Sequence, residues 1–180
     1  VLRSKGFSVE IFDGLSTSKS RTIDLPGEMN YLREFYPKPD QSPFGLFHQY
    51  RHFGYSFEHI GRISRDSKAF LVGISALFTP YFQEALKVAE SVKLFHPTCR
   101  TVIGGHHPTA FPRRTMEHPA IDFIIRGEGE ISMPLLAEAV KTGTDIASIP
   151  GIVFRKKDGT LHVNEPATVD NLDYLPLPAT

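Results

Sequence analysis

The sequence predicts an α/β fold in which helices cover both faces of a parallel sheet and a β-hairpin follows near the C-terminal end. Short, almost wholly apolar runs alternate with stretches of helical periodicity, and the links between them are short. Apolar runs of this kind are typical of strands that are buried on both faces. Near the C-terminal end, Asp158-Gly159 separates two β-rich runs, which is the strongest short-range signal for a hairpin.

Composition excludes several classes of protein. The 180 residues are 41% hydrophobic and 22% charged, close to globular averages, so a sizeable core is expected. Lys plus Arg and Asp plus Glu are 20 each, which argues against a nucleic-acid binder that works by bulk electrostatics. The single Cys99 excludes a disulfide framework, an all-cysteine zinc site and an iron–sulfur cluster held by this chain alone. A cytoplasmic location is expected, and no apolar run approaches the ~20 residues of a membrane span.

The N-terminal part has the least regular pattern. Residues 1–6 are typical of the last turn of a helix that Gly6 ends in the left-handed conformation. The β-rich run Phe7–Gly14 predicts a strand near 9–13, and the Ser- and Thr-rich residues 15–21 predict a loop.

The stretch 25–54 is rich in aromatic residues and interrupted by Pro and Gly. We favour an irregular segment that wraps the core with its rings buried singly. The alternative is a patch, over residues 31–57, that faces a partner or a pocket. After it, Ser56 is placed to cap a helix that runs to about Arg65.

The pattern is clearest from residue 69 onwards. Residues 70–75 predict a buried strand, and Thr79 is placed to cap a helix that begins at Pro80 and ends at His96-Pro97. Residues 101–104 and 122–126 predict two more buried strands, with a loop or helix over 113–117 between them. The core positions of the first helix are Phe82, Ala85, Leu86, Ala89 and Val92.

The last third of the chain combines one helix with a hairpin. A helix is predicted over 132–141, ended by Gly143, with Leu135, Leu136, Ala139 and Val140 facing the core. A separate hairpin is predicted near 152–164, and the Pro-containing tail 170–180 is typical of a linker.

Polar or glycine-rich loops follow three of the predicted strands, at Ser75–Thr79, Gly104–His107 and Gly127–Glu130. Ligands of open α/β sheets bind beyond the carboxyl ends of the strands, so these loops predict a binding site. Ser75 and Thr79 offer hydroxyl groups, and glycines allow a ligand to approach the backbone. Two alternatives stay open: Thr79 can serve only as a helix cap, and the glycine pair 104–105 can serve only as a tight turn.

Other chemistry has little support in the sequence. His106 and His107 are adjacent, and neighbouring side chains seldom bind one ion, so no metal site is predicted. Gly127-x-Gly129 lacks the third glycine of a dinucleotide fingerprint. Cys99 has no nearby base, and no catalytic triad or carboxylate pair is present, so no catalytic residue is predicted.

Three segments, Val72–Pro80, Val102–Ala110 and Asp122–Glu130, resemble the cobalamin-binding domain of B12-dependent radical SAM enzymes. The tail, through Ile149–Gly151 and Asn171–Pro178, is similar to the bridge that such enzymes place before their radical SAM barrel. Together these stretches cover most of residues 69–180.

The resemblance implies a flavodoxin-like (Rossmann-like) domain of five parallel strands, with the nucleotide tail of cobalamin threaded between the sheet and the loops. A bulky side chain at Gly105 is expected to block the tail and leave the fold intact. Cobalamin domains that supply a histidine as the lower cobalt ligand carry it in an Asp-x-His-x-x-Gly motif, which is absent here, so no protein histidine is expected to bind cobalt. The implied cofactor-binding residues are Ser75, Ala76, Leu77, Thr79, Gly104, Gly105, His106, Gly127, Glu128 and Gly129.

The implied domains are 1–148, a cobalamin-binding domain whose first strand is missing, and 149–180, a hairpin and linker toward an absent radical SAM domain. S-adenosylmethionine and a [4Fe–4S] cluster are expected only in that absent domain, where the full enzyme would transfer a methyl group or perform related radical chemistry. Two alternatives remain. One is a flavodoxin-like domain that binds a flavin or nucleotide, and the other is a docking or regulatory domain that has lost its ligand.

Overall fold

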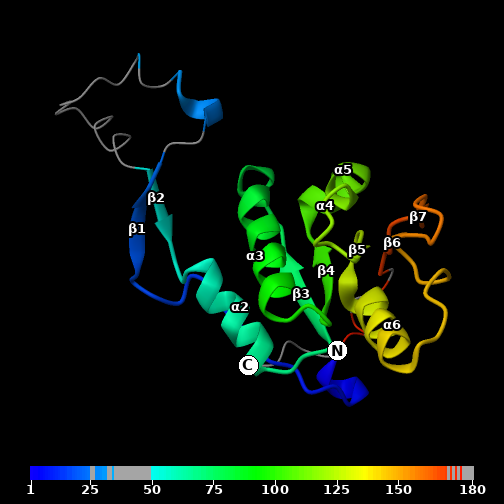
Figure 1. Cartoon of the computed structure of the whole chain (residues 1–180). Helices are drawn as coiled ribbons and strands as arrows, with labels where there is room; N and C mark the ends of the chain where they lie inside the picture. Colours follow the sequence, from blue (N-terminus) through cyan, green and yellow to red (C-terminus); the bar gives the residue numbers. More distant parts are fainter. Residues whose placement is uncertain are drawn as a thin grey trace. The chain divides into compact units, whose positions relative to one another are not determined.

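The computed structural model of the chain forms two compact units, which are considered separately (Figure 1). The larger unit comprises Val1–Ile11 and Phe57–Thr180, and the smaller comprises Phe12–Ser56. The structure describes residues 1–24, 27–31, 34, 50–169, 171, 173 and 175.

A five-stranded mixed sheet forms the centre of the larger unit, in the order β3-β4-β5-β6-β7. The first three strands are parallel, so their carboxyl ends meet at one edge; β6 and β7 are antiparallel to their neighbours. The strands are β3 (Leu71–Ser75), β4 (Arg100–Gly104), β5 (Phe123–Ile125), β6 (Ile152–Arg155) and β7 (Leu161–Val163).

Helices cover both faces of this sheet, as the sequence predicts (Figure 1). The helical elements of the larger unit are η1 (Arg3–Lys5), α2 (Phe57–Asp66), η4 (Thr79–Tyr81), α3 (Phe82–Phe95), α4 (His106–Ala110), α5 (Pro112–Met116) and α6 (Gly129–Thr142). Helix α2 lies against α3, where a β-carbon on Gly61 would overlap the side chains of Ser91 and Phe95. Among the described helices, none is long and apolar enough to cross a membrane.

The core forms two layers because successive strand residues point to opposite faces. Ile103 and Ile124 pack with Ala89 of α3 in one cluster. Their neighbours Val102 and Ile125 pack with Leu136 of α6 in the other. All five core positions predicted for α3 are buried, and Gly143 ends α6 in the left-handed conformation at φ 74°.

The smaller unit contains an antiparallel pair of strands, β1 (Ser20–Ile23) and β2 (Tyr50–Phe53), and the short helix η2 (Gly27–Met29). The loop predicted over 15–21 therefore ends in a strand that the sequence reading missed. Most of the aromatic stretch 25–54 lies outside the described residues, so neither interpretation of it is tested. Most of the predicted linker 170–180 also lies outside them.

The strand predicted near 9–13 is wrong: residues 7–13 have no strand assignment. A strand needs a neighbouring backbone for its hydrogen bonds, and no described segment pairs with this one. The segment ends in a turn at Asp13-Gly14, where the amide of Leu15 donates to the Asp13 carboxylate. Gly6 ends the short helix η1 at φ 85°, as expected.

Four further expectations need correction. The hairpin is not separate, because β6 pairs with β5, and the sheet is mixed rather than five parallel strands.

Thr79 does not cap α3, which begins three residues later, and the short helix η4 has no side-chain cap. Leu135 is exposed rather than in the core, because α6 turns that position to solvent. A short helix, α4, occupies 106–110, which the sequence reading had left as part of a loop.

Candidate functional site

The loops after β3 and β4 lie against each other at the carboxyl edge of the sheet. The amide of Ala76 donates to the carbonyl of Gly104 over 2.8 Å, and the amide of His107 donates to the carbonyl of Ala76 over 3.3 Å. These two bonds extend the parallel pairing of β3 and β4 beyond the strands. The paired backbones of residues 75–79 and 104–107 therefore form one surface, which we call the platform. Ser75 and Thr79 are exposed on it beside the buried side chain of Ala76.

The two glycines of the second loop have different reasons to be glycine. Gly105 has φ 115°, and a β-carbon there would lie 2.6 Å from the carbonyl oxygen of Ala76. Its lack of a side chain is thus required by the neighbouring loop, which corrects the expectation that a bulky residue would leave the fold intact. A β-carbon on Gly104 would meet only the Ile125 carbonyl, at 3.6 Å, which is an ordinary contact. Gly104 is therefore the position of the pair at which the protein itself tolerates a side chain.

The third loop is covered by the segment 164–169 that follows β7. A β-carbon on Gly127 would overlap the carbonyl of Ala167, which also accepts a hydrogen bond from the Glu128 amide at 3.0 Å. The Glu128 carboxylate in turn accepts a hydrogen bond from the Val169 amide. Gly129 begins α6, and a β-carbon there would meet nothing within 4 Å. Gly127 and Glu128 thus serve the packing of the C-terminal segment.

The two adjacent histidines have opposite surroundings. His106 is exposed, whereas His107 is only 5% exposed and stacks on the ring of Phe82, with ring centroids 3.8 Å apart. His107 Nδ1 lies 3.2 Å from Thr79 Oγ1. Burial lowers the pKa of His107 below its ordinary value of 6.5, and the positive charge of Arg114 lowers it further. The sequence reading selected His106 and missed His107, because the five-residue helix α4 is too short to show a periodicity that would separate buried from exposed positions.

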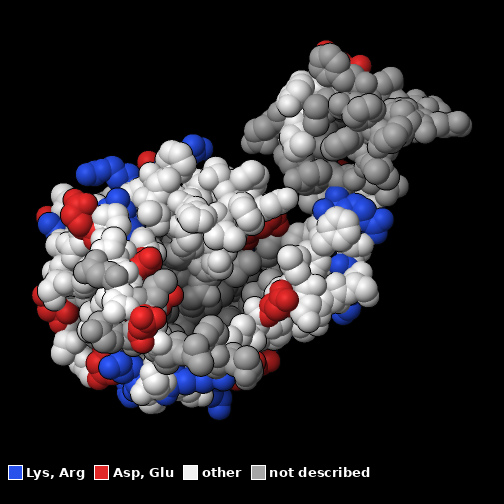
Figure 2. Space-filling model, turned by 180° about the vertical axis from the view of Figure 1, so that it is seen from behind, with Lys and Arg blue, Asp and Glu red and all other residues white. Residues whose placement is uncertain are grey.

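Large apolar side chains are exposed around this edge. Leu77, Phe78 and Tyr81 follow β3, with the rings of the latter two edge to face at 6.5 Å. Phe111, after α4, is also exposed. Clustered exposed apolar side chains of this size mark a ligand or partner surface. On the face shown in Figure 2, acidic and basic side chains intermingle around the margin of the larger unit, so the balanced charge is not sorted into one-sign patches there.

The other ionisable clusters do not form a reactive site. Among the described residues, no group of three or more His, Cys, Asp or Glu side chains is arranged to hold a metal ion. Burial raises the pKa of the Cys99 thiol to about 11, so the thiol is protonated at neutral pH.

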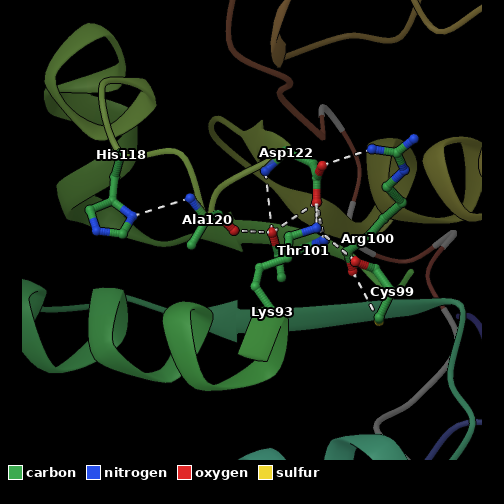
Figure 3. Close-up of polar contacts among 7 residues, drawn as sticks. All are labelled: Lys93, Cys99, Arg100, Thr101, His118, Ala120 and Asp122. Atoms are coloured by element: carbon green, nitrogen blue, oxygen red, sulfur yellow. Dashed lines mark hydrogen bonds and ion pairs between the residues drawn. The ribbon is translucent and has the colours of Figure 1, made fainter. Parts of the chain in front are cut away.

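A dense polar network lies at the opposite edge of the sheet, where β4 and β5 begin (Figure 3). The Asp122 carboxylate accepts hydrogen bonds from Lys93, from Arg100 at 2.9 Å and from the amide and hydroxyl of Thr101. Burial by itself raises the pKa of Asp122, but these donors outweigh it and hold the pKa below its ordinary value of 3.8. Four hydrogen bonds already converge on this carboxylate, so the network serves to join β4 to β5.

A family model for the B12-binding domain matches residues 47–137, half of the chain, and spans both the β3 and β4 loops and the start of α6. The chain belongs to the B12-binding domain family. Cobalamin is thus the cofactor expected in this domain.

Relatives and solved structures agree with this assignment. The B12-binding domain is 34% identical over 127 residues to an uncharacterized methyltransferase of Pyrococcus horikoshii, covering 69% of this chain and 27% of that one. It is 24% identical over 163 residues to the cytidylyl-2-hydroxyethylphosphonate methyltransferase of Streptomyces wedmorensis, covering 91% and 27%. The fold matches the cobalamin-dependent S-adenosylmethionine radical enzyme OxsB, with TM-score 0.56 and 22% identity over 68% of this chain and 17% of that one. The chain spans about a quarter of the length of these curated relatives.

Proposed function

We propose that the B12-binding domain holds cobalamin against the carboxyl edge of β3 and β4, as the cofactor module of a B12-dependent radical SAM enzyme. The observation that carries the proposal is the platform formed by the paired loops, on which exposed hydroxyls stand beside exposed apolar side chains. Such a mixed surface suits the nucleotide tail of cobalamin, which has a flat aromatic base and a polar ribose phosphate.

The residues present fit the cofactor in three respects. Gly104 has room that a side chain would fill, without being needed by the protein's own packing. Ser75 and Thr79 are exposed and can donate or accept hydrogen bonds. The buried His107 ring lies beside Thr79, with Nδ1 3.2 Å from Thr79 Oγ1, so the hydroxyl that would meet the proposed tail has a fixed polar neighbour.

We assign the ten residues to four roles. Ser75, Leu77, Thr79 and Gly104 would contact the tail directly, and His106 would stand at the mouth of the site. Ala76 and Gly105 would act through their backbone, because they hold the two loops together. Gly127 and Glu128 would close the other side through the segment 164–169, which they contact, and Gly129 would leave the start of α6 open beside them.

Bound cobalamin would supply a methyl-carrying or redox-active cobalt, while the protein sets orientation and access of water. The exposed side chains of Leu77, Phe78 and Tyr81 would exclude water from the cofactor. In the full protein, residues 149–180 would lead to a radical SAM domain. That domain would hold S-adenosylmethionine and a [4Fe–4S] cluster. Methyl transfer is the reaction proposed for the full-length protein.

Reconstitution tests this function. The 180-residue chain is incubated with hydroxocobalamin and desalted, and its absorption spectrum is recorded. We expect cobalamin to stay with the parent chain and to be lost from Ser75→Leu, which places a bulky group on the platform. A matched control is Thr98→Leu at an exposed position of the α3–β4 loop, which should retain it. A folded parent chain that elutes without cobalamin contradicts the proposal, and retention of flavin mononucleotide instead would support the alternative ligand class.

A further inference from the structure

His107 and Thr79 form a polar pair between the two site loops, 28 residues apart in the sequence. The imidazole is held from several sides: it stacks on Phe82, lies 5.3 Å from the ring of Phe111 by centroids, and its own amide donates to Ala76. The ring is thus fixed in position, whereas Thr79 is exposed at the edge of the platform. The pair connects a buried group to a hydroxyl that a ligand can reach.

The protonation of the two ring nitrogens of His107 determines which member of this pair donates the hydrogen bond. Nδ1 faces Thr79 Oγ1, while Nε2 is buried and has no hydrogen-bond partner among the residues that the structure describes. A neutral imidazole has one N–H and one bare nitrogen, and among buried backbone groups an orphaned N–H is rarer than an under-satisfied acceptor, a preference that we extend to this ring. The arrangement with the bare nitrogen at Nε2 therefore places the proton on Nδ1. A doubly protonated ring would bury an unpaired N–H of a charged group, which is costlier still.

We propose that neutral His107 donates its Nδ1–H to Thr79 Oγ1, so that the hydroxyl proton of Thr79 is directed to an acceptor oxygen of the bound cofactor tail. This inference rests on the proposed function for its ligand, but not for the polarity of the pair. His107 is a positioning residue: it does not touch the cofactor, and its hydrogen bond leaves the proton of Thr79 free to be donated to the ligand.

The direction of this hydroxyl matters because its neighbours are apolar. Leu77 and Phe78 are exposed beside Thr79 and cannot orient a polar group. A hydroxyl that already accepts one hydrogen bond from a fixed imidazole keeps its own proton free, so it favours acceptor oxygens, such as those of a phosphate or an amide, over donors.

The first test measures the tautomer in the cofactor-free chain. Long-range ¹H–¹⁵N spectra near neutral pH distinguish a protonated from a bare ring nitrogen, and the spectrum of His107→Phe identifies the His107 signals among the eight histidines. Protonated Nδ1 with bare Nε2 is expected. The opposite tautomer, or two protonated nitrogens, overturns the proposal.

The second test measures hydroxocobalamin affinity in a double-mutant cycle. Thr79→Ser, which keeps the hydroxyl, should bind within a few-fold of the parent, and Thr79→Val should bind about tenfold more weakly. His107→Phe keeps an aromatic ring and should weaken binding in the parent but have no further effect in Thr79→Val. Equal effects of His107→Phe in both backgrounds would show a general packing role and refute the positioning role. If the parent chain does not bind hydroxocobalamin, both the proposed function and the proposed contact between Thr79 and the cofactor are wrong. The tautomer measurement still shows whether His107 donates its hydrogen bond to Thr79.

Discussion

Gly105 lies directly against the backbone of Ala76, and a β-carbon at Gly105 would be 2.6 Å from the Ala76 carbonyl oxygen. Since the same carbonyl accepts the His107 amide, a shift of either loop would disturb both. The close approach of two backbones, rather than space for a ligand, thus explains this glycine.

We therefore expect Gly105→Ala to destabilise the fold by about 1–3 kcal/mol from its positive φ alone, and the close contact adds to this. Gly104→Ala is the control, because its β-carbon makes only an ordinary contact. Thermal unfolding should show a lower melting temperature for the first variant and a nearly unchanged one for the second. Equal melting temperatures would contradict the steric explanation.

Neutralising Asp122 should destabilise the amino-terminal edge of the sheet. Asp122→Asn removes the counter-charge of Lys93, whose side chain is 23% exposed, and we expect a loss of about 2–3 kcal/mol in urea unfolding. Glu58→Gln breaks the exposed ion pair with Arg62 on α2 and should cost at most about 0.5 kcal/mol. A comparable loss in both variants would show that the burial of Asp122 is unimportant.

Acid unfolding should report the same carboxylate. Because the folded state holds the pKa of Asp122 below 3.8, its stabilisation is fully present above pH 3.8 and is lost as pH falls below that value. The free energy of unfolding of the parent chain should therefore fall more steeply with acid below pH 3.8 than that of Asp122→Asn. Parallel curves for the two chains would count against this assignment.

His107 should make the stability of the fold depend on pH in a less acidic range than Asp122 does. Its pKa is lower in the folded state than the ordinary 6.5, so below pH 6.5 the unfolded state binds protons more readily than the folded state. The contribution of His107 is constant above about pH 6.5 and is lost as pH falls below it. The melting temperature of the parent chain should drop between pH 7.5 and 5.5 by more than that of His107→Phe, which has nothing to titrate at this position.

No protein histidine of this chain is expected to bind cobalt as a lower axial ligand. His107 is buried with Nδ1 engaged by Thr79, and His106 begins α4 beside the platform. The electron paramagnetic resonance spectrum of the cob(II)alamin-loaded chain should lack axial nitrogen splitting from the protein. Splitting that disappears in His106→Ala or His107→Ala would refute this expectation.

The amino-acid pattern was sufficient for the elements of the sheet core and for the loops that follow its parallel strands. The apolar runs at 70–75, 101–104 and 122–126 are strands, and the spacing from Phe82 to Val92 marks the buried face of α3. These predictions succeed because strand and helix periodicities are local and burial on one or both faces dictates the apolar positions. The loops at the strand ends follow from the parallel order, which short helical connections impose.

Only the tertiary structure decided which of these residues serve the protein and which remain available to a ligand. Residues 7–13 have a strand-like sequence but no described pairing partner, and the hairpin joins β5 although nothing within 152–164 specifies that edge. Likewise, Gly104 and Gly105 are equivalent in the sequence, as are His106 and His107. The glycines differ because Ala76, 29 positions before Gly105, packs against Gly105. The histidines differ because Thr79 and Phe82 lie against His107. Contacts between segments far apart in the chain leave no periodic trace in either segment, so they become visible only when the chain is folded.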